Sequence, residues 1–313
     1  IAIPANATTW IRLSLENMTS TEQERILSLV NHASLHNRLW QKEGSTWRFV
    51  ADINYQDWRK YPSKPSPTPH FKLDIPKGHN ELLISVTNRA FQNIQIELWQ
   101  TGAYWKRVFD DTTLYAFFVA LCLAMATYNL ALYNSMNDSM YLYYAGYIFF
   151  GSMFFPLRDQ IYSIWFDTNL LGFVGVGGNE IVLPLTITAA MLMLALYSFR
   201  FLDLTFTNSR QKALKFVILA LPIFFSLFEI AQLLGTNNVH VSQILRMATT
   251  TSVLFFGLTM IAVITYAATA GPSRVLGRWL LVTQGIALIG AILESLRMLG
   301  YLSDSFRFAL HTG

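Results

Sequence analysis

Five charged side chains lie inside otherwise apolar stretches of the second half of the chain. They are Glu180, Glu229, Arg246, Glu294 and Arg297. A charge inside a bilayer is costly unless it is paired, so each of these residues is a functional candidate. At a rise of about 1.5 Å per helical residue, all five fall in the outer third of a bilayer. We expect a polar cluster below the first region of the chain, with a Glu229–Arg246 ion pair. The alternative is that several of them, Glu180 and Arg297 among them, extend to the outer interface.

A second set of candidates lies in the first third of the chain, which holds six of the eight tryptophans. Exposed aromatic rings can stack on sugar rings, and Lys and Arg exceed Asp and Glu there by 13 to 9. These features make carbohydrate, including acidic glycans, a candidate ligand. The candidate ligand-binding residues are Trp47, Trp58, Arg48 and Arg59. The alternative is structural, because tryptophans fill sandwich cores, and Trp99 and Trp105 precede a span where interfacial tryptophans gather.

No pattern typical of an active site accompanies these residues. The sequence has no glycine-rich phosphate loop, no paired histidines on a helix and no nucleophile elbow. Cys122 is the only cysteine, which excludes an intrachain disulfide and a cysteine-based zinc site. His32 and His36 form the closest histidine pair, and no second cluster accompanies them. We therefore expect the chain as given to be no enzyme, with no metal, no cofactor and no nucleic-acid partner.

Composition divides the chain into two regions that would position these side chains. Only 13% of the residues are charged, against about 25% in soluble domains, which predicts a membrane protein. Residues 1–107 consist of short stretches in which apolar and polar residues alternate, with turn residues between them. This pattern predicts an extracytoplasmic β-sandwich domain. The stretch "KEGS", residues 42–45, is a predicted hairpin turn.

Residues 108–313 contain six apolar stretches long enough to span a bilayer. They lie near residues 112–134, 140–157, 180–201, 213–234, 242–269 and 277–300. The tail "SDSFRFALHTG" is similar to the start of a seventh span. Basic residues concentrate in the loops between spans three and four and between spans five and six, which places those loops in the cytoplasm. An all-α transmembrane helix bundle is therefore expected, with the β-sandwich on the other side of the membrane.

Several stretches resemble the bacterial seven-transmembrane receptors with diverse intracellular signalling modules that carry the second type of extracellular β-domain. They are "TTWIRLSLEN", "HFKLDIPKGHNELLISVTNR", "IELWQTGAYWKR" and "ATYNLALYNSMNDSMYLYYAGY". The resemblance covers essentially the whole chain. In the family's plan "NSMND" is a short cytoplasmic turn between the first two spans, and the residues around it pack the two helices together. These are Tyr128, Asn129, Asp138, Tyr141 and Tyr144, of which Asn129 is expected to hydrogen-bond to the neighbouring helix.

The resemblance implies a sensor in the inner membrane of a Gram-negative bacterium. Its jelly-roll-like domain, residues 1–107, would bind a small molecule or a carbohydrate in the periplasm. Residues 108–313 would lie in membrane lipid and pass the state to a cytoplasmic signalling partner or output domain. In the family this output is commonly a diguanylate cyclase or a histidine kinase, which would follow residue 313 and would suit a homodimer.

Two other classes of function stay open. The first is a non-enzymatic accessory subunit of a larger membrane complex, in which the β-domain and the spans form a docking surface. The second, less favoured, is a transporter, because no inverted pair of Gly/Pro-broken spans is seen beyond Pro184 and Pro222.

Overall fold

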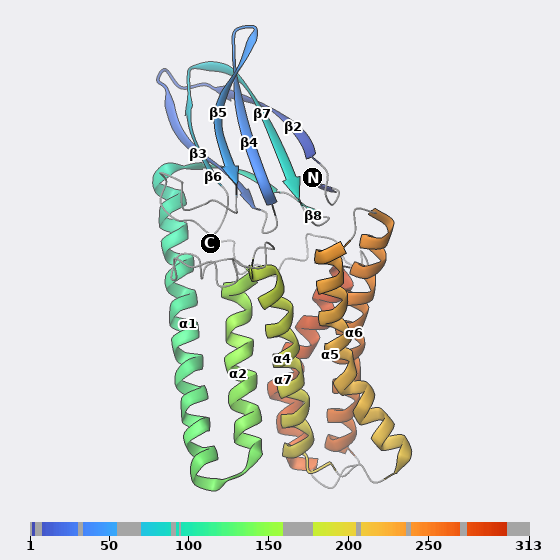
Figure 1. Cartoon of the computed structure of the whole chain (residues 1–313). Helices are drawn as coiled ribbons and strands as arrows, with labels where there is room; N and C mark the ends of the chain where they lie inside the picture. Colours follow the sequence, from blue (N-terminus) through green and yellow to red (C-terminus); the bar gives the residue numbers. More distant parts are fainter. Residues whose placement is uncertain are drawn as a thin grey trace. The chain divides into compact units, whose positions relative to one another are not determined.

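The computed structural model describes residues 2–3, 8–30, 34–54, 70–88, 92–93, 95–158, 178–204, 208–235, 239–269 and 274–298. The strands are β1 (Ala2–Ile3), β2 (Thr8–Asn17), β3 (Gln23–Val30), β4 (Ser34–Glu43), β5 (Thr46–Asn54), β6 (His70–Ile75), β7 (Gly78–Asn88), β8 (Gln92–Asn93) and β9 (Gln95–Gln100). The helices are α1 (Thr101–Met136), α2 (Ser139–Arg158), α4 (Gly178–Phe201), α5 (Ser209–Gly235), α6 (Val239–Thr269) and α7 (Arg274–Met298). Figure 1 shows these elements along the chain.

Two antiparallel sheets form the N-terminal part of the chain. One has four strands in the order β2-β7-β4-β5, and the other has three in the order β6-β3-β9. Consecutive strands repeatedly change sheet, because β2 lies in the first sheet, β3 in the second and β4 in the first again. The short strands β1 and β8 pair with each other. The β-sandwich predicted from the alternating stretches is confirmed.

Alternation along each strand builds the sandwich core. In β2, for example, Ile11 is buried while its neighbours Trp10 and Arg12 are exposed, as a period of two requires. The same alternation holds in β6, where Phe71, Leu73 and Ile75 are buried. The other buried side chains of this core are Leu27, Leu29, Leu39, Ile53, Leu82, Ile84 and Val86. Each buried aliphatic or aromatic side chain contributes about 1.5–3 kcal/mol to stability.

The hairpin predicted at "KEGS" is also present. β4 ends at Glu43 and β5 begins at Thr46, with Gly44 and Ser45 in the turn. Gly44 has a φ of 63°, a left-handed conformation that glycine adopts without steric cost. A two-residue turn of this kind fixes the register of the two strands, so β4 and β5 are adjacent in the sheet.

The second part of the described chain is helical. Four of its helices contain a stretch long and apolar enough to cross a membrane, namely Thr101–Met136, Ile181–Phe201, Ser209–Ala231 and Met247–Thr269. α2 and α7 coincide with the second and sixth predicted spans. The start of a seventh span was predicted after residue 300 and lies outside the described residues. The chain is therefore a membrane protein with an N-terminal β-domain.

α1 begins earlier than the span predicted there. It has 36 residues, about 54 Å at 1.5 Å per residue, whereas the hydrocarbon core of a bilayer is about 30 Å thick. Its first turns contain Lys106, Arg107, Asp110 and Asp111, which are unfavourable in hydrocarbon. These turns thus extend the helix beyond the apolar stretch.

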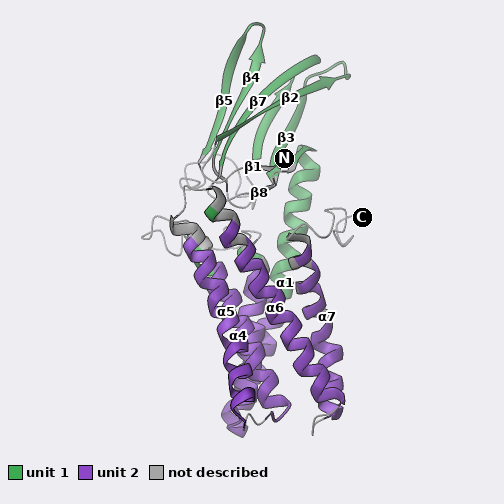
Figure 2. Ribbon diagram, turned by 90° about the vertical axis from the view of Figure 1, so that its right-hand side faces the viewer, with its two compact units in different colours: residues 1–118, 155–182, 233–243 green, residues 119–154, 183–232, 244–313 purple. Residues whose placement is uncertain are grey.

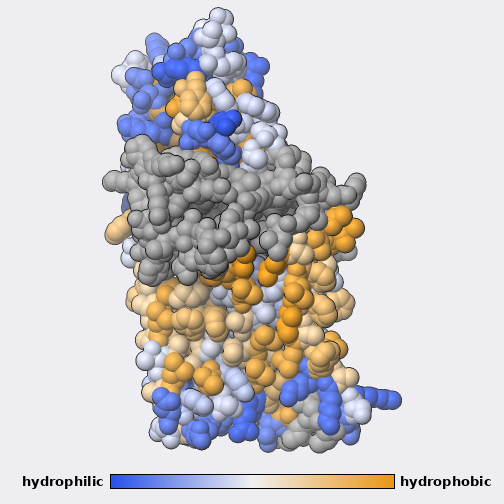
Figure 3. Space-filling model, viewed as in Figure 1, coloured by the Kyte–Doolittle hydropathy of each residue, from blue (hydrophilic) through white to orange (hydrophobic). Residues whose placement is uncertain are grey.

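The chain divides into two compact units (Figure 2). Unit 1 contains the sandwich, the start of α1 and two shorter segments, and comprises Ile1–Phe118, Phe155–Val182 and Leu233–Gln243. Unit 2 comprises Val119–Phe154, Leu183–Gln232 and Ile244–Gly313. In Figure 3 apolar residues gather over the helices, and hydrophilic residues gather at the helix ends near the turn between α1 and α2. This distribution is the one that a lipid environment requires.

Candidate functional site

The outer face of the four-stranded sheet carries a row of aromatic side chains. The rings of Trp10 on β2 and Trp40 on β4 have centroids 5.2 Å apart, and Phe49 on β5 lies edge-on at 5.8 Å from Trp40. β7 lies between β2 and β4, and there the small Ser85 is directly across from Trp10, which lets the two indoles meet. Trp10 and Phe49 are 57% and 53% exposed. An exposed aromatic cluster of this kind is typical of an interaction site.

A β-bulge brings Phe49 to this face. Leu39 pairs with Ala51 while the next residue, Trp40, pairs with Phe49, so Val50 is an extra residue in β5. An extra residue reverses the alternation along a strand. Phe49, before the bulge, and Asp52, after it, therefore both point to the outer face. Phe49 lies across from Trp40, and Asp52 lies across from Arg38.

A groove next to the aromatic row adds polar groups. It is a depression open to solvent, with a volume of about 410 Å³, and is lined by Thr8, Trp10, His36, Arg38, Ser85 and Thr87. These residues form two rows across three strands: Thr8, Thr87 and His36 in one, and Trp10, Ser85 and Arg38 in the other. The groove thus combines an indole, three hydroxyls, an imidazole and a guanidinium. Its size falls within the range of about 300–1,000 Å³ typical of small-molecule sites.

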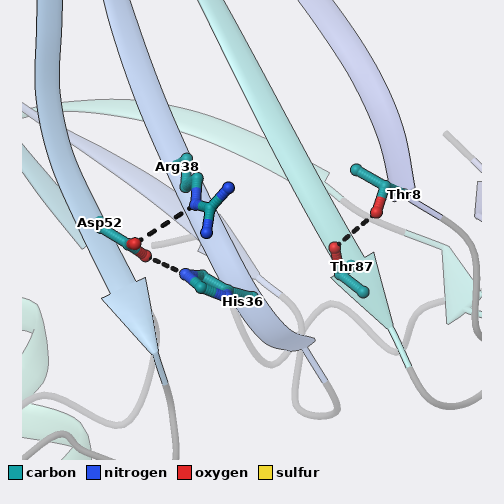
Figure 4. Close-up of polar contacts among 5 residues, drawn as sticks. All are labelled: Thr8, His36, Arg38, Asp52 and Thr87. Atoms are coloured by element: carbon teal, nitrogen blue, oxygen red, sulfur yellow. Dashed lines mark hydrogen bonds and ion pairs between the residues drawn. The ribbon is translucent and has the colours of Figure 1, made fainter.

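Two sets of contacts hold the groove side chains in place (Figure 4). Asp52 on β5 accepts a hydrogen bond from Arg38 Nε at 3.2 Å on one carboxylate oxygen and contacts His36 Nε2 with the other. The hydroxyls of Thr8 and Thr87 lie 2.9 Å apart. Arg38 and His36 come from the same strand, two residues apart, so one carboxylate orients both. Contacts within the sheet therefore orient four of these side chains, those of His36, Arg38, Thr8 and Thr87.

A charge network lies further along the same face. Glu81 on β7 accepts a hydrogen bond from Arg12 at 2.7 Å and pairs with Lys42 at 2.8 Å. The hydrogen bond from Lys42, followed by that from Arg12, lowers the pKa of the Glu81 carboxyl to about 2. Two cations thus share the Glu81 carboxylate, and a second carboxylate, Glu16 of β2, lies on the same face in the next row, across from His79.

The outer face of the three-stranded sheet is occupied instead of open. The ring of His70 on β6 lies 5.3 Å from both Tyr104 and Trp105 of α1. Arg107 Nη1 donates to Glu97 Oε2 at 3.3 Å, and its guanidinium lies 4.9 Å above the Trp99 ring. Tyr104 is only 3% exposed. The first turns of α1 therefore pack on this sheet, and its aromatic side chains are structural.

The four ligand-binding residues predicted from the sequence do not form one site in the described structure, which includes only Trp47 and Arg48 of them. Trp47 lies on the outer face of β5 and is 38% exposed. Arg48 pairs with Gln41, a buried residue of the inner face, and its Nε contacts Glu43 at 2.9 Å at the sheet edge. Trp58 and Arg59 lie outside the described residues. Whether any of the four binds a ligand stays a prediction.

Most residues of the groove and the aromatic row were not singled out by the sequence. A signal for Trp10 was present, because Ile11, Leu13 and Leu15 share one face of β2 and leave Trp10 on the other. For Phe49 no local signal existed, since the bulge that reverses its direction depends on pairing with β4. Arg38 and Ser85 lie 47 positions apart in the sequence and meet only through sheet pairing.

The charged residues predicted to cluster within the bilayer lie on four different helices. Glu180 is on α4, Glu229 on α5, Arg246 on α6, and Glu294 and Arg297 on α7. Glu229 is partly buried. The side chains of the other four lie outside the described part of the chain, so the cluster and the Glu229–Arg246 ion pair stay predictions.

The turn between α1 and α2 shows what "NSMND" does. Asn137 has a φ of 52° and its N–H donates to the Tyr133 carbonyl oxygen at 2.7 Å, which ends α1. Asp138 Oδ1 accepts a hydrogen bond from the Met140 N–H at 3.0 Å, which caps α2. Arg200, at the end of α4, donates to the same oxygen at 3.2 Å. The backbone bond from Met140, followed by Arg200, lowers the pKa of the Asp138 carboxyl.

The other residues of the predicted helix-packing motif have different surroundings. Asn129 is buried, but its Nδ2 donates to the Met125 carbonyl oxygen of its own helix at 2.8 Å. The described hydrogen bonds thus replace the expected bond to a neighbouring helix with one inside α1, as short polar side chains often do. Tyr144 packs on Tyr197 of α4 at 4.9 Å. Tyr128 is largely exposed, and Tyr141 is partly buried.

α4 and α5 are joined by a reciprocal pair of hydrogen bonds. Thr188 of α4 donates to the carbonyl oxygen of Pro222 on α5 at 2.9 Å, and Ser226 of α5 donates to the carbonyl oxygen of Pro184 on α4 at 3.1 Å. Each hydroxyl lies one turn after the proline of its own helix, and the two hydroxyls also contact each other. The two prolines therefore mark a contact between adjacent helices.

Comparison with known proteins follows the same division of the chain. The model of the family described as 7TM diverse intracellular signalling matches residues 111–313. The model described as 7TMR-DISM extracellular 2 matches residues 4–100. No curated protein and no solved structure matches the chain.

Proposed function

Because this chain belongs to the 7TMR-DISM family of membrane sensory receptors, we propose that it detects a carbohydrate with the outer face of its four-stranded sheet. The setting we propose is the inner membrane of a Gram-negative bacterium, with the β-domain in the periplasm. Ligand binding would shift a two-state arrangement of the helices. A cytoplasmic signalling partner or output domain, such as a cyclase or a kinase, would read that arrangement.

One observation supports this proposal most directly. Both outer faces of the sandwich carry aromatic side chains, and among the described residues only those of the four-stranded sheet have large rings exposed next to a groove. Trp10 and Trp40 present apolar rings beside hydroxyl, imidazole and guanidinium groups. Sugar rings need this combination, because they have apolar C–H faces and polar edges.

The position of α1 supports a route for the signal. β9 ends at Gln100 and α1 begins at the next residue, Thr101. Thr101 also donates to Glu24 of β3 at 3.0 Å. A displacement of the three-stranded sheet would therefore move the start of α1 directly, without a flexible linker to absorb it.

The test is a binding measurement on the full chain in detergent or nanodiscs, by titration calorimetry against a panel of neutral and acidic oligosaccharides. We expect at least one of them to bind and Trp40→Ala to weaken that binding by about tenfold, since loss of a stacked ring removes about 1 kcal/mol or more. Met18→Ala, a change at an exposed apolar residue of the turn after β2, is the control and should bind normally.

Two outcomes would contradict the proposal. If no oligosaccharide bound, the aromatic row would not be a sugar site. If, in addition, the full chain co-purified with a constant set of membrane proteins and Trp40→Ala released them, the face would be a docking surface. The chain would then be an accessory subunit of a larger membrane complex.

A further inference from the structure

We propose that the groove is a subsite for the carboxylate of an acidic sugar, so that the ligand is an oligosaccharide containing uronic acid. This inference rests on the proposed function and specifies the chemical class of its ligand. The ring of the acidic sugar would stack on Trp10, and its carboxylate would bind the terminal nitrogens of Arg38.

The groups that line the groove favour an anionic ligand. Its lining contains one guanidinium, one imidazole and three hydroxyls, and no carboxylate belongs to the described residues that line it. Asp52, which pairs with Arg38, is outside the lining, and its two oxygens contact Arg38 and His36. An anionic group in the groove therefore meets hydrogen-bond donors, including the guanidinium of Arg38, and no lining carboxylate among the described residues.

The orientation of Arg38 suits a carboxylate. Its contact with Asp52 uses Nε, and in Figure 4 the two terminal nitrogens lie beyond Nε, at the end of the side chain. A guanidinium held in this way offers two parallel N–H donors, which match the two oxygens of a carboxylate. Because Asp52 already fixes the side chain, little further ordering is needed on binding.

The distance between Trp10 and Arg38 matches the size of one acidic sugar. Trp10 and Arg38 face the same side, in one row, with Ser85 of β7 between them. Adjacent strands are about 4.8 Å apart, so the two residues are separated by about 10 Å. That distance accommodates one pyranose ring with its exocyclic carboxylate. The hydroxyls of Ser85, Thr8 and Thr87 lie where they can bond the ring hydroxyls or the second carboxylate oxygen.

The experiment compares each acidic oligosaccharide with its own carboxyl-reduced form. Tri- and tetrasaccharides of galacturonate, glucuronate and mannuronate, and the same molecules after reduction of the carboxylate to a hydroxymethyl group, are titrated into the full chain. We expect at least one acidic oligomer to bind ten to a hundred times more tightly than its reduced form, the range of a charge-assisted hydrogen-bond pair, about 1.5–3 kcal/mol. Higher salt should narrow this difference.

Two variants localise the effect. Arg38→Gln should remove the preference, so that the acidic oligomer and its reduced form bind with the same affinity. Arg25→Gln removes a guanidinium from the three-stranded sheet and should leave the preference intact. Near-ultraviolet circular dichroism confirms that each variant is folded before it is titrated.

The outcomes separate this inference from the proposed function. Equal binding of acidic and reduced oligomers, or a preference that survives Arg38→Gln, would overturn the carboxylate subsite while the sugar receptor stood. Binding of none of the panel, neutral oligomers included, would overturn both.

Discussion

The two outer faces of the sandwich have similar side chains, but α1 packs on one of them and the other is exposed. Each carries tryptophan, histidine and a carboxylate, and an arginine contacts each of them, Arg38 of β4 on one face and Arg107 of α1 on the other. On the three-stranded sheet these groups contact α1, where His70 lies against Tyr104 and Arg107 lies over Trp99. On the four-stranded sheet the equivalent groups contact one another and leave rings and a groove exposed. Residue type therefore does not predict which face stays exposed, whereas coverage by another element decides it.

The largest effect on stability should come from removing a ring where α1 packs on the three-stranded sheet. Tyr104→Ala should lower the free energy of unfolding by about 3 kcal/mol, because a large buried side chain leaves a cavity. Trp10→Ala, at an exposed ring, should change it by about 1 kcal/mol or less. Denaturant unfolding of the full chain in detergent, followed by near-ultraviolet circular dichroism, measures both. If Trp10→Ala destabilised the fold as much as Tyr104→Ala, the open face would be structural.

A smaller effect is expected for arginines on the two faces. Arg107 contacts Glu97 at 3.3 Å, Asp111 at 3.7 Å and the Trp99 ring. Because the side chain is partly solvent-exposed, Arg107→Gln should destabilise by only about 1 kcal/mol. Arg38→Gln should have less effect on unfolding and a larger effect on ligand affinity. The reverse pattern in these two measurements would exchange the roles assigned to the two faces.

A still smaller effect is expected at the edge of the groove. Thr8→Val removes the hydrogen bond to Thr87 but keeps the branched shape of the side chain. The loss should be about 0.5 kcal/mol, typical of an exposed cross-strand pair. Unfolding in the same assay measures it. A loss several times larger would mean that the threonine pair holds the sheet together instead of shaping the groove.

Each face contains a glutamate whose pKa is lowered by its partners, so acid should reduce the stability that each one contributes. Lys42 and then Arg12 lower the pKa of Glu81 to about 2, from 4.5, and Lys72 followed by Thr101 lowers the pKa of Glu24 on the other sheet. A lowered pKa in the folded state stabilises the fold above the unfolded value and loses that contribution as pH falls. For Glu81 the loss should occur between about pH 4.5 and pH 2.

Glu81→Gln and Glu24→Gln test this by acid titration of stability. Each variant should lose less stability than the parent chain over the acidic window, and neither should change the dependence at neutral pH. If Glu81→Gln left the acid response unchanged, the charge network with Lys42 and Arg12 would not be formed in solution.

Much of the architecture was determined by the sequence itself. Local patterns were sufficient for this, because alternation with period two defines a strand with one buried face and a long apolar stretch defines a span. The turn at Gly44 was equally local, since it depends on one residue that adopts a positive φ. The end of α1 and the cap of α2, at Asn137 and Asp138, also lie within the predicted short turn.

The tertiary structure alone decided which groups meet. Trp10 and Trp40 become neighbours because β7 is inserted between β2 and β4, and Phe49 joins them because pairing with β4 creates a bulge. Arg48, adjacent to Trp47 in sequence, lies at the sheet edge because β5 is the last strand of the sheet. These relations depend on strand order and register, which are set by contacts between residues far apart in the chain. The sequence therefore supplies the aromatic and charged side chains, whereas strand pairing decides which of them meet and packing against α1 decides which are covered.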